Sequence, residues 1–371
     1  MRRTPALIAG GGPAGAVAAL RLAQGGAVPL LLERSRGMPD ALCGGFLSWR
    51  TLESLASVGI DRATLGGHVV RRVVLFAGRR RAESALPAPA IGLSRRRLDA
   101  LLLDHAIAAG AGVERGVTIR SADGTTLHTS DGATVTGTTL FLATGKHELR
   151  GASRDAAIGD DPAMGVRVRV APHPALARLV GDAIELHAFA GGYAGLVVQE
   201  DGSANLCMAL RRSRLRAAGD LPALLTALAA ESPALGERLA FLGDTPTIDA
   251  IANVPYGWRT GTTTPGVYRL GDQAGVIPSL AGEGMGIAIA SAIRATGHWR
   301  HDGAAGAERY QHDLARALHR PIALAGMLRT LAEHPAGHGA LLTGGRIAPL
   351  VAAAARWTRV ASVSPGSASP A

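Results

Sequence analysis

The sequence has few cysteines, few aromatic residues and no long apolar run. Its 371 residues include only two cysteines, Cys43 and Cys207, which are too few for a disulfide framework or a cysteine-ligated metal cluster. This usage is typical of a reducing compartment and predicts a cytoplasmic protein. The 12 histidines do not pair with acidic residues at a metal-ligand spacing, so no metal site is expected. No stretch of about eighteen apolar residues occurs, and no membrane span is predicted.

The positive charge is almost entirely arginine. Lysines and arginines number 39 against 29 acidic residues, which gives a net charge of +10, and Lys146 is the only lysine. The only tight basic runs are residues 79–81 and 95–97. Neither is interleaved with aromatic residues, which make up 4% of the chain, so stacking platforms for bases are scarce. We therefore expect no nucleic-acid partner.

The C-terminal part contains one further apolar segment. Residues 347–360 are apolar apart from a few positions such as Arg356 and Arg359. The pattern predicts a terminal helix packed on the protein, with weak contact to a membrane surface as the alternative. Residues 362–371 are rich in serine, proline and alanine and are expected to be a disordered tail.

A glycine-rich turn, GGGPAG at residues 10–15, is the most informative feature that is present. It follows the apolar run 6–9 and opens into an alanine- and leucine-rich segment. A second apolar run, 28–32, then ends in Glu33. Strand, turn, helix, strand and acidic residue make one βαβ unit that predicts a dinucleotide site.

Each part of this unit has a physical role. Gly10 permits the tight turn, Gly12 lets the backbone approach a pyrophosphate, and Gly15 lets the helix pack on the strand. The helix start favours the negative charge of the phosphates, and Glu33 can accept hydrogen bonds from a ribose. The contacts expected here are Gly10, Gly12, Pro13, Ala14, Gly15, Glu33 and Arg34.

The nucleotide-binding sheet is predicted to be built from separated pieces. Residues 139–143 and 267–270 have the pattern of buried parallel strands that return to the first sheet, while 165–210 contains several further strands. Residues 87–89 (Pro-Ala-Pro) predict a loop, and a helix is expected over 286–296. The chain is 47% hydrophobic and long enough for two domains, and its split layout favours a flavoprotein.

A second motif lies far along the chain. Residues 268–275 are YRLGDQAG, followed by Pro278, Gly282 and Gly284. In this order the two motifs resemble those of the FAD-dependent oxidoreductase superfamily of p-hydroxybenzoate hydroxylase-like monooxygenases and geranylgeranyl reductases. In that superfamily the aspartate, here Asp272, bonds the ribityl chain of FAD, and the following helix start points at the flavin pyrimidine.

The resemblance implies an α/β fold. It comprises a Rossmann-like FAD-binding domain of the glutathione reductase type, an inserted β-rich substrate domain and C-terminal helices. The expected boundaries are 1–72, 92–160 and 262–300 for the FAD-binding domain, 73–91 and 161–261 for the substrate domain, and 301–361 for the helical segment.

A third motif, Gly-Leu-Ser-Arg at residues 92–95, resembles the start of the family's helix that carries a basic residue near the cofactor phosphates or ribityl chain. The further FAD contacts that the resemblance implies are Cys43, Gly44, Arg95, Val117, Thr144, Gly145, Asp272, Gly282, Gly284, Met285 and Gly286.

Two features point to different reactions. Aromatic hydroxylases carry an Asp-Gly element where this chain has Thr144-Gly145-Lys146, which argues against hydroxylase-style handling of NADPH. Cys43 and the two glycines after it resemble a flavin-proximal loop of the geranylgeranyl reductases. Cys43 is therefore a candidate proton donor, and Tyr193 a candidate donor to a substrate oxygen.

The predicted function is that of an FAD-dependent oxidoreductase, first a flavin monooxygenase that hydroxylates or oxidises an aromatic or polyketide-like small molecule. The first alternative is a flavin-dependent alkene reductase of the geranylgeranyl type, and the second is a non-catalytic flavin-binding protein. No second G-x-G-x-x-G module is present, so NAD(P)H is expected only as a transient reductant. The protein is expected to be a monomer or a homodimer.

Overall fold

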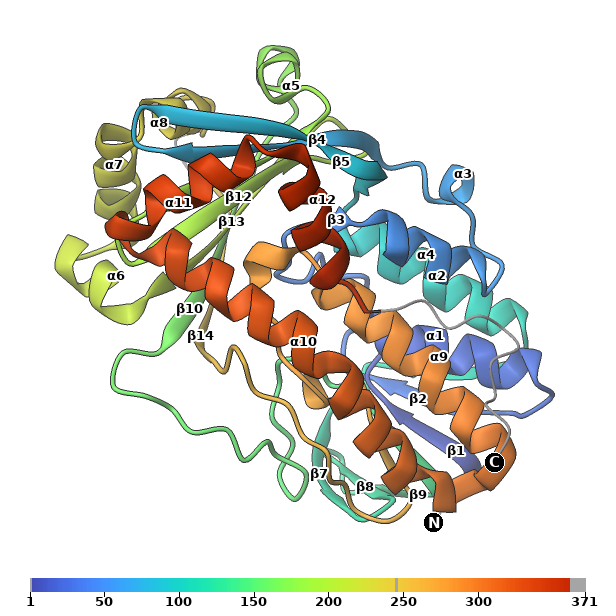
Figure 1. Ribbon diagram of the computed structural model, residues 1–371. Coiled ribbons are helices and arrows are strands. Elements are labelled where there is room, and N and C mark those ends of the chain that lie inside the picture. Colours follow the sequence, from blue (N-terminus) through green and yellow to red (C-terminus); the bar gives the residue numbers. More distant parts are fainter. Residues whose placement is uncertain (1, 244–245, 361–371) are drawn as a thin grey trace.

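The computed structural model describes residues 2–243 and 246–360, so the predicted tail at 362–371 lies outside the described residues. The chain forms two β-sheets, called sheet A and sheet B, with helices packed against both (Figure 1). One long helix, α10 (Ala307–Glu333), contacts β15 of sheet A and β11 and β12 of sheet B. The predicted fold class, a Rossmann-like domain with a β-rich insertion and C-terminal helices, is confirmed.

Sheet A is mainly parallel and contains the predicted βαβ unit. Its strands are, in spatial order, β6 (Gly112–Arg115), β2 (Leu30–Glu33), β1 (Arg2–Ala9), β9 (Thr134–Leu142), β8 (Thr126–Thr129) and β7 (Ile119–Asp123), with β15 (Val267–Arg269) also beside β9. β1 runs parallel to β2 and β9, and β15 runs parallel to β9. The carboxyl ends of β1, β2, β9 and β15 therefore meet at one edge, where ligands gather in such sheets.

Three helices form a layer with this sheet: α1 (Pro13–Gln24), α4 (Arg95–Ala108) and α9 (Gly284–Asp302). α1 packs against both α4 and α9, and its small alanines allow the close approach. Ser94 caps α4 by accepting a hydrogen bond from the Arg97 amide. α9 begins two residues earlier than the predicted helix at 286, so Gly284 and Met285 lie in its first turn.

Sheet B contains the inserted strands. Their spatial order is β14 (Ile248–Val254), β10 (Ala163–Val170), β13 (Ala204–Arg211), β12 (Gly192–Val198), β11 (Ala183–Phe189), β4 (His68–Ala77), β5 (Arg80–Gly92) and β3 (Phe46–Leu47). The loop predicted at residues 87–89 is wrong, because these residues lie within β5. The pairing of β4 with β5 shifts register between Val70 and Arg72, so residues 86–89 bulge out of the ladder and Pro87 and Pro89 need no paired N–H there.

Short helices flank the sheets. They are α2 (Trp49–Ala56), α3 (Arg62–Leu65), α5 (Pro174–Val180), α6 (Arg212–Ala218), α7 (Leu221–Glu231) and α8 (Pro233–Leu239). Leucines of α7 and α8 share one apolar cluster with β10, β12 and β13, which buries one face of sheet B. The other face packs against the end of α10 and against α11 (Pro335–Gly345).

The last helix, α12 (Ala348–Trp357), contacts β5, α10 and α11 but buries none of its side chains completely. Leu350 and Trp357 are exposed. The predicted packing of this helix is therefore only partial, and contact with a membrane surface stays a prediction. Within the described residues, no helix is both long and apolar enough to cross a membrane.

Candidate functional site

The glycine-rich turn after β1 leads directly into α1. Gly10 has φ +105°, which favours glycine, and a Cβ there would lie 2.5 Å from a carbonyl oxygen at the end of β9. A Cβ on Gly15 would overlap the carbonyl oxygen of Gly10, so the helix packs closely on the turn. Gly12 is the N-cap and no side chain caps the helix, whose first residues are Pro13 and Ala14. These uncapped amides suit an anion.

Glu33 lies at the end of β2, next to this turn. One carboxylate oxygen accepts a hydrogen bond from the Gly11 amide at 2.7 Å, and the other accepts one from the amide two residues further on at 2.8 Å. Arg34 is exposed, and its guanidinium lies 2.7 Å from Nε2 of His147. The Val117 amide donates to the carbonyl oxygen of Glu33. The predicted acidic residue is thus fixed beside the glycine turn.

Arg95 comes from the first turn of α4 and reaches the same turn. A Cβ added to Gly12 would lie 3.2 Å from one of its terminal nitrogens. The guanidinium makes a double hydrogen bond with Asp99, at 2.9 Å and 2.7 Å. Burial alone would lower the pKa of Arg95, but the Asp99 carboxylate raises it, so a permanent cation faces the start of α1. This placement suits a phosphate.

Arg154, which the sequence interpretation missed, joins the loop after β9 to the segment after β15. Its buried guanidinium donates to the carbonyl oxygens of Gly145 (3.3 Å) and Asp272 (3.0 Å). The side chain of Gln273 also donates to the Gly145 carbonyl, at 2.8 Å. Thr144 donates its hydroxyl within the loop, to the carbonyl of residue 147. No local motif marks Arg154, and its contact with Asp272 joins residues that are far apart in sequence.

Asp272 forms an ion pair with the only lysine. The Nζ atom of Lys146 lies 3.3 Å from one carboxylate oxygen of Asp272. The charge of Asp272 is the main reason that the pKa of Lys146 is raised. The two predicted cofactor motifs, at residues 144–145 and 271–275, therefore meet through both backbone and side-chain contacts.

Three of the predicted contact glycines face open space. A Cβ added to Gly44, Gly145 or Gly284 would meet no atom within 4 Å. In contrast, Gly282 has φ +64°, and a Cβ there would lie 2.9 Å from the ring of Phe46. The open glycines come from three separate segments, so a planar group can approach the backbone of each without meeting a side chain.

Glu283, also missed from the sequence, supports the start of α9 from within. Its carboxylate accepts a hydrogen bond from the Ser48 hydroxyl at 3.1 Å and lies 3.1 Å from Nε of Arg359. Burial raises the pKa of Glu283 to about 7, although the charge of Arg359 opposes this. Gly286 packs against the Glu283 side chain, and Met285 lies in the hydrophobic core.

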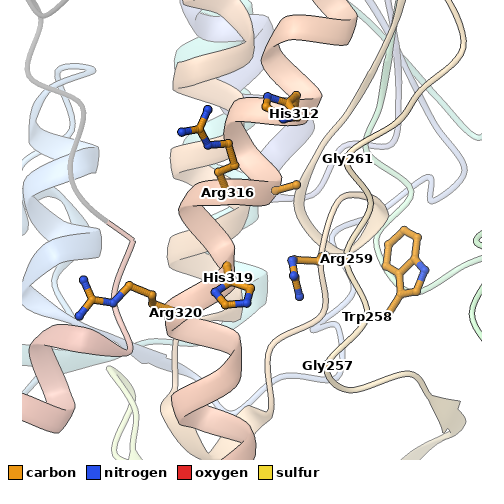
Figure 2. Close-up of a pocket in the computed structure, with 9 residues that line it drawn as sticks. Gly257, Trp258, Arg259, Gly261, His312, Arg316, His319 and Arg320 are labelled. Carbon is orange, nitrogen blue, oxygen red and sulfur yellow. The ribbon is translucent and has the colours of Figure 1, made fainter.

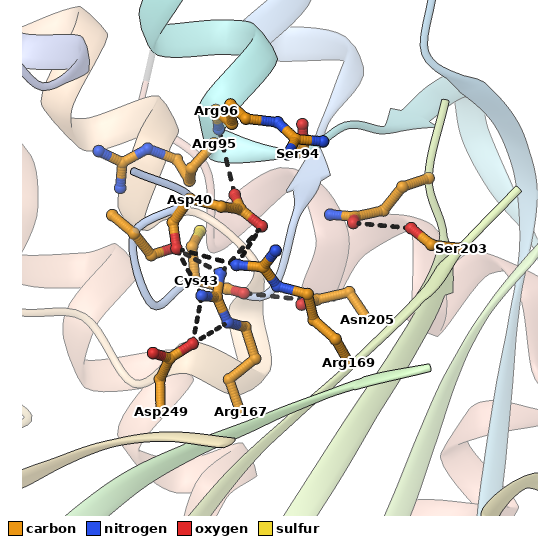
Figure 3. Close-up of polar contacts among 12 residues, drawn as sticks. Asp40, Cys43, Ser94, Arg95, Arg96, Arg167, Arg169, Ser203, Asn205 and Asp249 are labelled. Atoms are coloured by element: carbon orange, nitrogen blue, oxygen red, sulfur yellow. Dashed lines mark hydrogen bonds and ion pairs between the residues drawn. The ribbon is translucent and has the colours of Figure 1, made fainter. Parts of the chain in front are cut away.

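The loop that carries Cys43 and Gly44 is attached to sheet B (Figure 3). Arg167 of β10 is 2% exposed and pairs with the carboxylates of Asp40, at 3.3 Å, and Asp249. It also donates to the backbone carbonyl of Asp40. Asn205 of β13 donates to the carbonyl oxygen of Cys43 at 2.9 Å. Sheet B thereby fixes the position of the Cys43 loop.

Tyr193 has its hydroxyl bonded within the protein. It lies 2.6 Å from the Ser279 hydroxyl and accepts a hydrogen bond from the Leu280 amide at 2.8 Å. Tyr256 donates to the same serine, at 3.1 Å. Burial raises the pKa of Tyr193 well above its usual range. These bonds give Tyr193 a structural role in holding residues 279–280, while its catalytic role stays a prediction.

A surface hollow of about 770 Å³ lies between α10 and residues 257–261 (Figure 2). Arg259, Arg316 and Arg320 are exposed along it. None of the predicted site residues lines this hollow, so it is separate from the predicted cofactor site. Within the described residues, no group of three or more His, Cys, Asp or Glu side chains is placed to hold a metal ion.

Comparison with protein-family models matches residues 3–152 to the FAD binding domain family. The chain carries an FAD-binding domain. The matched range includes the glycine turn, Glu33, Arg95 and the loop after β9. None of the curated proteins compared with the sequence matches it.

Solved structures share the fold over most of the chain. Pseudomonas aeruginosa PqsL, in complex with 2-aminobenzoylacetate, superposes with a TM-score of 0.75 at 17% identity, over 92% of this chain and 100% of PqsL. A geranylgeranyl bacteriochlorophyll reductase-like protein from Thermoplasma acidophilum has a TM-score of 0.74 at 17% identity, over 95% and 96%. The halogenase PltM, in complex with phloroglucinol and FAD, has a TM-score of 0.74 at 14% identity, over 98% and 88%.

The residues around the FAD-binding domain fit FAD chemically. The uncapped start of α1 and Arg95 suit the pyrophosphate, and Glu33 and Asp272 offer carboxylates to ribose and ribityl hydroxyls. Gly44, Gly145 and Gly284 leave backbone open to a flat ring. The glycine turn, Gly145 and Asp272 follow strands of sheet A, whereas sheet B holds the loop of Gly44 and Gly284 begins α9.

Proposed function

We propose that this chain is a flavin monooxygenase that uses FAD to oxidise an aromatic or polyketide-like small molecule. The proposal rests on one observation: segments that are far apart in the sequence lie close together in the folded chain. The glycine turn, Arg95 and Asp272 lie beside the carboxyl edge of sheet A. The Cys43 loop is joined to the start of α4 through Asp40, which accepts a hydrogen bond from the Arg96 amide, and to sheet B through Asn205.

Bound FAD would supply two-electron redox chemistry, which the protein's side chains cannot provide. The chain's own residues bind and orient the reactants. The start of α9 has no side-chain cap, so its free amides would favour negative charge on a flavin ring bound beside Gly284. Arg154 and Gln273 hold the loop after β9 in place, and the buried Glu283–Arg359 pair supports the turn before α9.

The solved structures that share this fold include, according to their names, both oxidising and reducing flavoproteins. PqsL was solved with 2-aminobenzoylacetate and PltM with phloroglucinol, both small aromatic compounds. They support an aromatic substrate for this chain. NAD(P)H is proposed as a transient electron donor, because the sequence holds no second dinucleotide motif.

The test is made on purified FAD-loaded protein. The flavin is reduced anaerobically and mixed with oxygen, with and without candidate aromatic compounds. Oxygen uptake coupled to product formation supports the proposal. Reoxidation that releases all electrons as hydrogen peroxide, with no substrate oxidised, contradicts it.

A flavin-dependent alkene reductase is the second candidate. Cys43, held by Asn205 in a loop beside open glycine backbone, is the observation that favours it, because a thiol there can deliver a proton. Anaerobic reduction of a prenyl alkene by the reduced protein, lost in Cys43→Ser, would support this candidate. A non-catalytic flavin-binding protein would instead show no substrate-stimulated oxidation of NAD(P)H.

A further inference from the structure

The surface hollow between α10 and residues 257–261 is strongly basic. No acidic side chain lines it, and its five basic side chains are those of Arg259, His312, Arg316, His319 and Arg320. All five are exposed. The carboxylate of Asp313 lies close to one of them, 3.8 Å from Nδ1 of His312. The three guanidiniums therefore dominate the charge of the hollow.

These three arginines have no partner within the part of the chain that the structure describes. No hydrogen bond or ion pair joins the side chain of Arg259, Arg316 or Arg320 to another described residue. Arg316 and Arg320 also lie one turn apart on α10, a spacing at which like charges destabilise a helix. An anion bound between them would remove this repulsion.

Small residues keep the hollow open. A Cβ added to Gly257 would meet no atom within 4 Å, and one added to Gly261 would lie 3.6 Å from the Cβ of Ala315. The volume of about 770 Å³ lies within the usual range of small-molecule pockets, roughly 300–1,000 Å³. The hollow thus has room for a ligand of several heavy atoms beside its basic side chains.

The backbone on both sides of the hollow is held by hydrogen bonds. The Gly257 amide donates to the carbonyl oxygen of Val276 at 2.8 Å, and the Val276 amide donates back to the carbonyl oxygen of residue 258 at 2.8 Å. From α10, the buried side chain of Gln311 donates to the carbonyl oxygen of Thr260 at 3.0 Å. The two walls are therefore joined before a ligand binds, which lowers the ordering cost of binding.

The lining favours charge over stacking. Trp258 is the one tryptophan, tyrosine or phenylalanine among the lining residues, and its Nε1 atom donates to the carboxylate of Asp155 at 2.9 Å. Its ring points away from α10, whereas the side chain of Arg259 points toward that helix (Figure 2). The hollow thus offers guanidinium forks, which bind phosphate oxygens in pairs, but no flat surface for a base.

We propose that this hollow binds the polyphosphate group of a small ligand, either a nucleoside triphosphate or an inorganic polyphosphate. Guanidiniums on two facing walls match an anion that carries several charged groups, which a single carboxylate does not supply. The inference does not rest on the proposed function, because none of the predicted cofactor-site residues lines the hollow.

The test is isothermal titration calorimetry on FAD-loaded full-length protein, freed of unbound FAD, at constant ionic strength. The probes are sodium triphosphate, orthophosphate, ATP and hexaglutamate. We expect one triphosphate per chain, bound about tenfold or more tightly than orthophosphate, since more charge-assisted hydrogen bonds form. Equal affinity for ATP identifies the polyphosphate group as the part that binds, and tighter binding of ATP identifies a nucleotide as the ligand.

Arg316→Gln and Arg259→Gln are each expected to weaken triphosphate binding about tenfold, the loss of one charge-assisted hydrogen bond. Arg79→Gln is the matched control, because it removes an exposed positive charge between β4 and β5, and it should keep the full affinity. Thermal unfolding without ligand checks that all three variants fold. The inference is overturned if triphosphate does not saturate a site, if hexaglutamate binds as tightly, or if both hollow variants bind triphosphate as the control does.

Discussion

The buried carboxylate of Glu283 makes the stability of the protein depend on pH. Burial raises the pKa of Glu283 from its ordinary value of 4.5 to about 7. The folded state therefore holds a proton that the unfolded state has already released. The stabilising contribution of this proton is fully present below pH 4.5 and is lost as the pH rises through about 7. At about 1.4 kcal/mol per pKa unit, the shift amounts to about 3 kcal/mol.

Glu283→Gln removes this titration and leaves the Arg359 cation in place at every pH. We expect the free energy of unfolding of the variant, relative to the original protein, to rise by about 3 kcal/mol between about pH 4.5 and about pH 8. With an unfolding entropy of roughly 2.1 cal/mol/K per residue, this corresponds to a difference in Tm of about 4 °C.

Thermal unfolding at a series of pH values measures the effect. Glu53→Gln is the control, since Glu53 is an exposed partner of Arg50 and contributes little at any pH. A difference between the original protein and Glu283→Gln that stays constant over the whole pH range would refute the reasoning. It would show that Arg359 keeps Glu283 ionised throughout.

Three further predictions concern single contacts. Glu33→Ala should weaken FAD affinity by about tenfold or more, measured by fluorescence titration of the apoprotein, because the carboxylate that fixes the glycine turn is lost; unchanged affinity would contradict its assignment. Arg167→Met should lower the free energy of unfolding by about 1–3 kcal/mol in denaturant titrations, since the buried carboxylate of Asp40 loses one of its two arginine partners and keeps Arg169. Tyr193→Phe should lower it by about 1–3 kcal/mol and leave FAD affinity unchanged, because its hydroxyl bonds Ser279 and Leu280. A loss of FAD in Tyr193→Phe would contradict that structural role.

The parts of the fold that local sequence determines were predictable. The glycine turn, the helix after it and Glu33 lie within one short segment, and each residue type has a backbone or hydrogen-bonding reason to be there. The parallel strands at β9 and β15 were also predictable, because strands buried on both faces are continuously apolar.

The errors and omissions depend on partners that are distant in sequence. Pro87 and Pro89 indicate a loop locally, but a register shift opposite them lets the strand continue. Arg154 contacts Asp272, and Glu283 contacts Arg359, across long stretches of chain. Neither pair forms a local sequence motif, so the roles of Arg154 and Glu283 are visible only in the folded structure.

The most direct test of the account is whether the purified protein binds FAD at the predicted site. We expect one FAD per chain, released as intact FAD on denaturation, with Asp272→Ala and Glu33→Ala both losing the yellow cofactor more readily. Protein that takes up no FAD, or retention of FAD unchanged in both variants, would contradict the central claim.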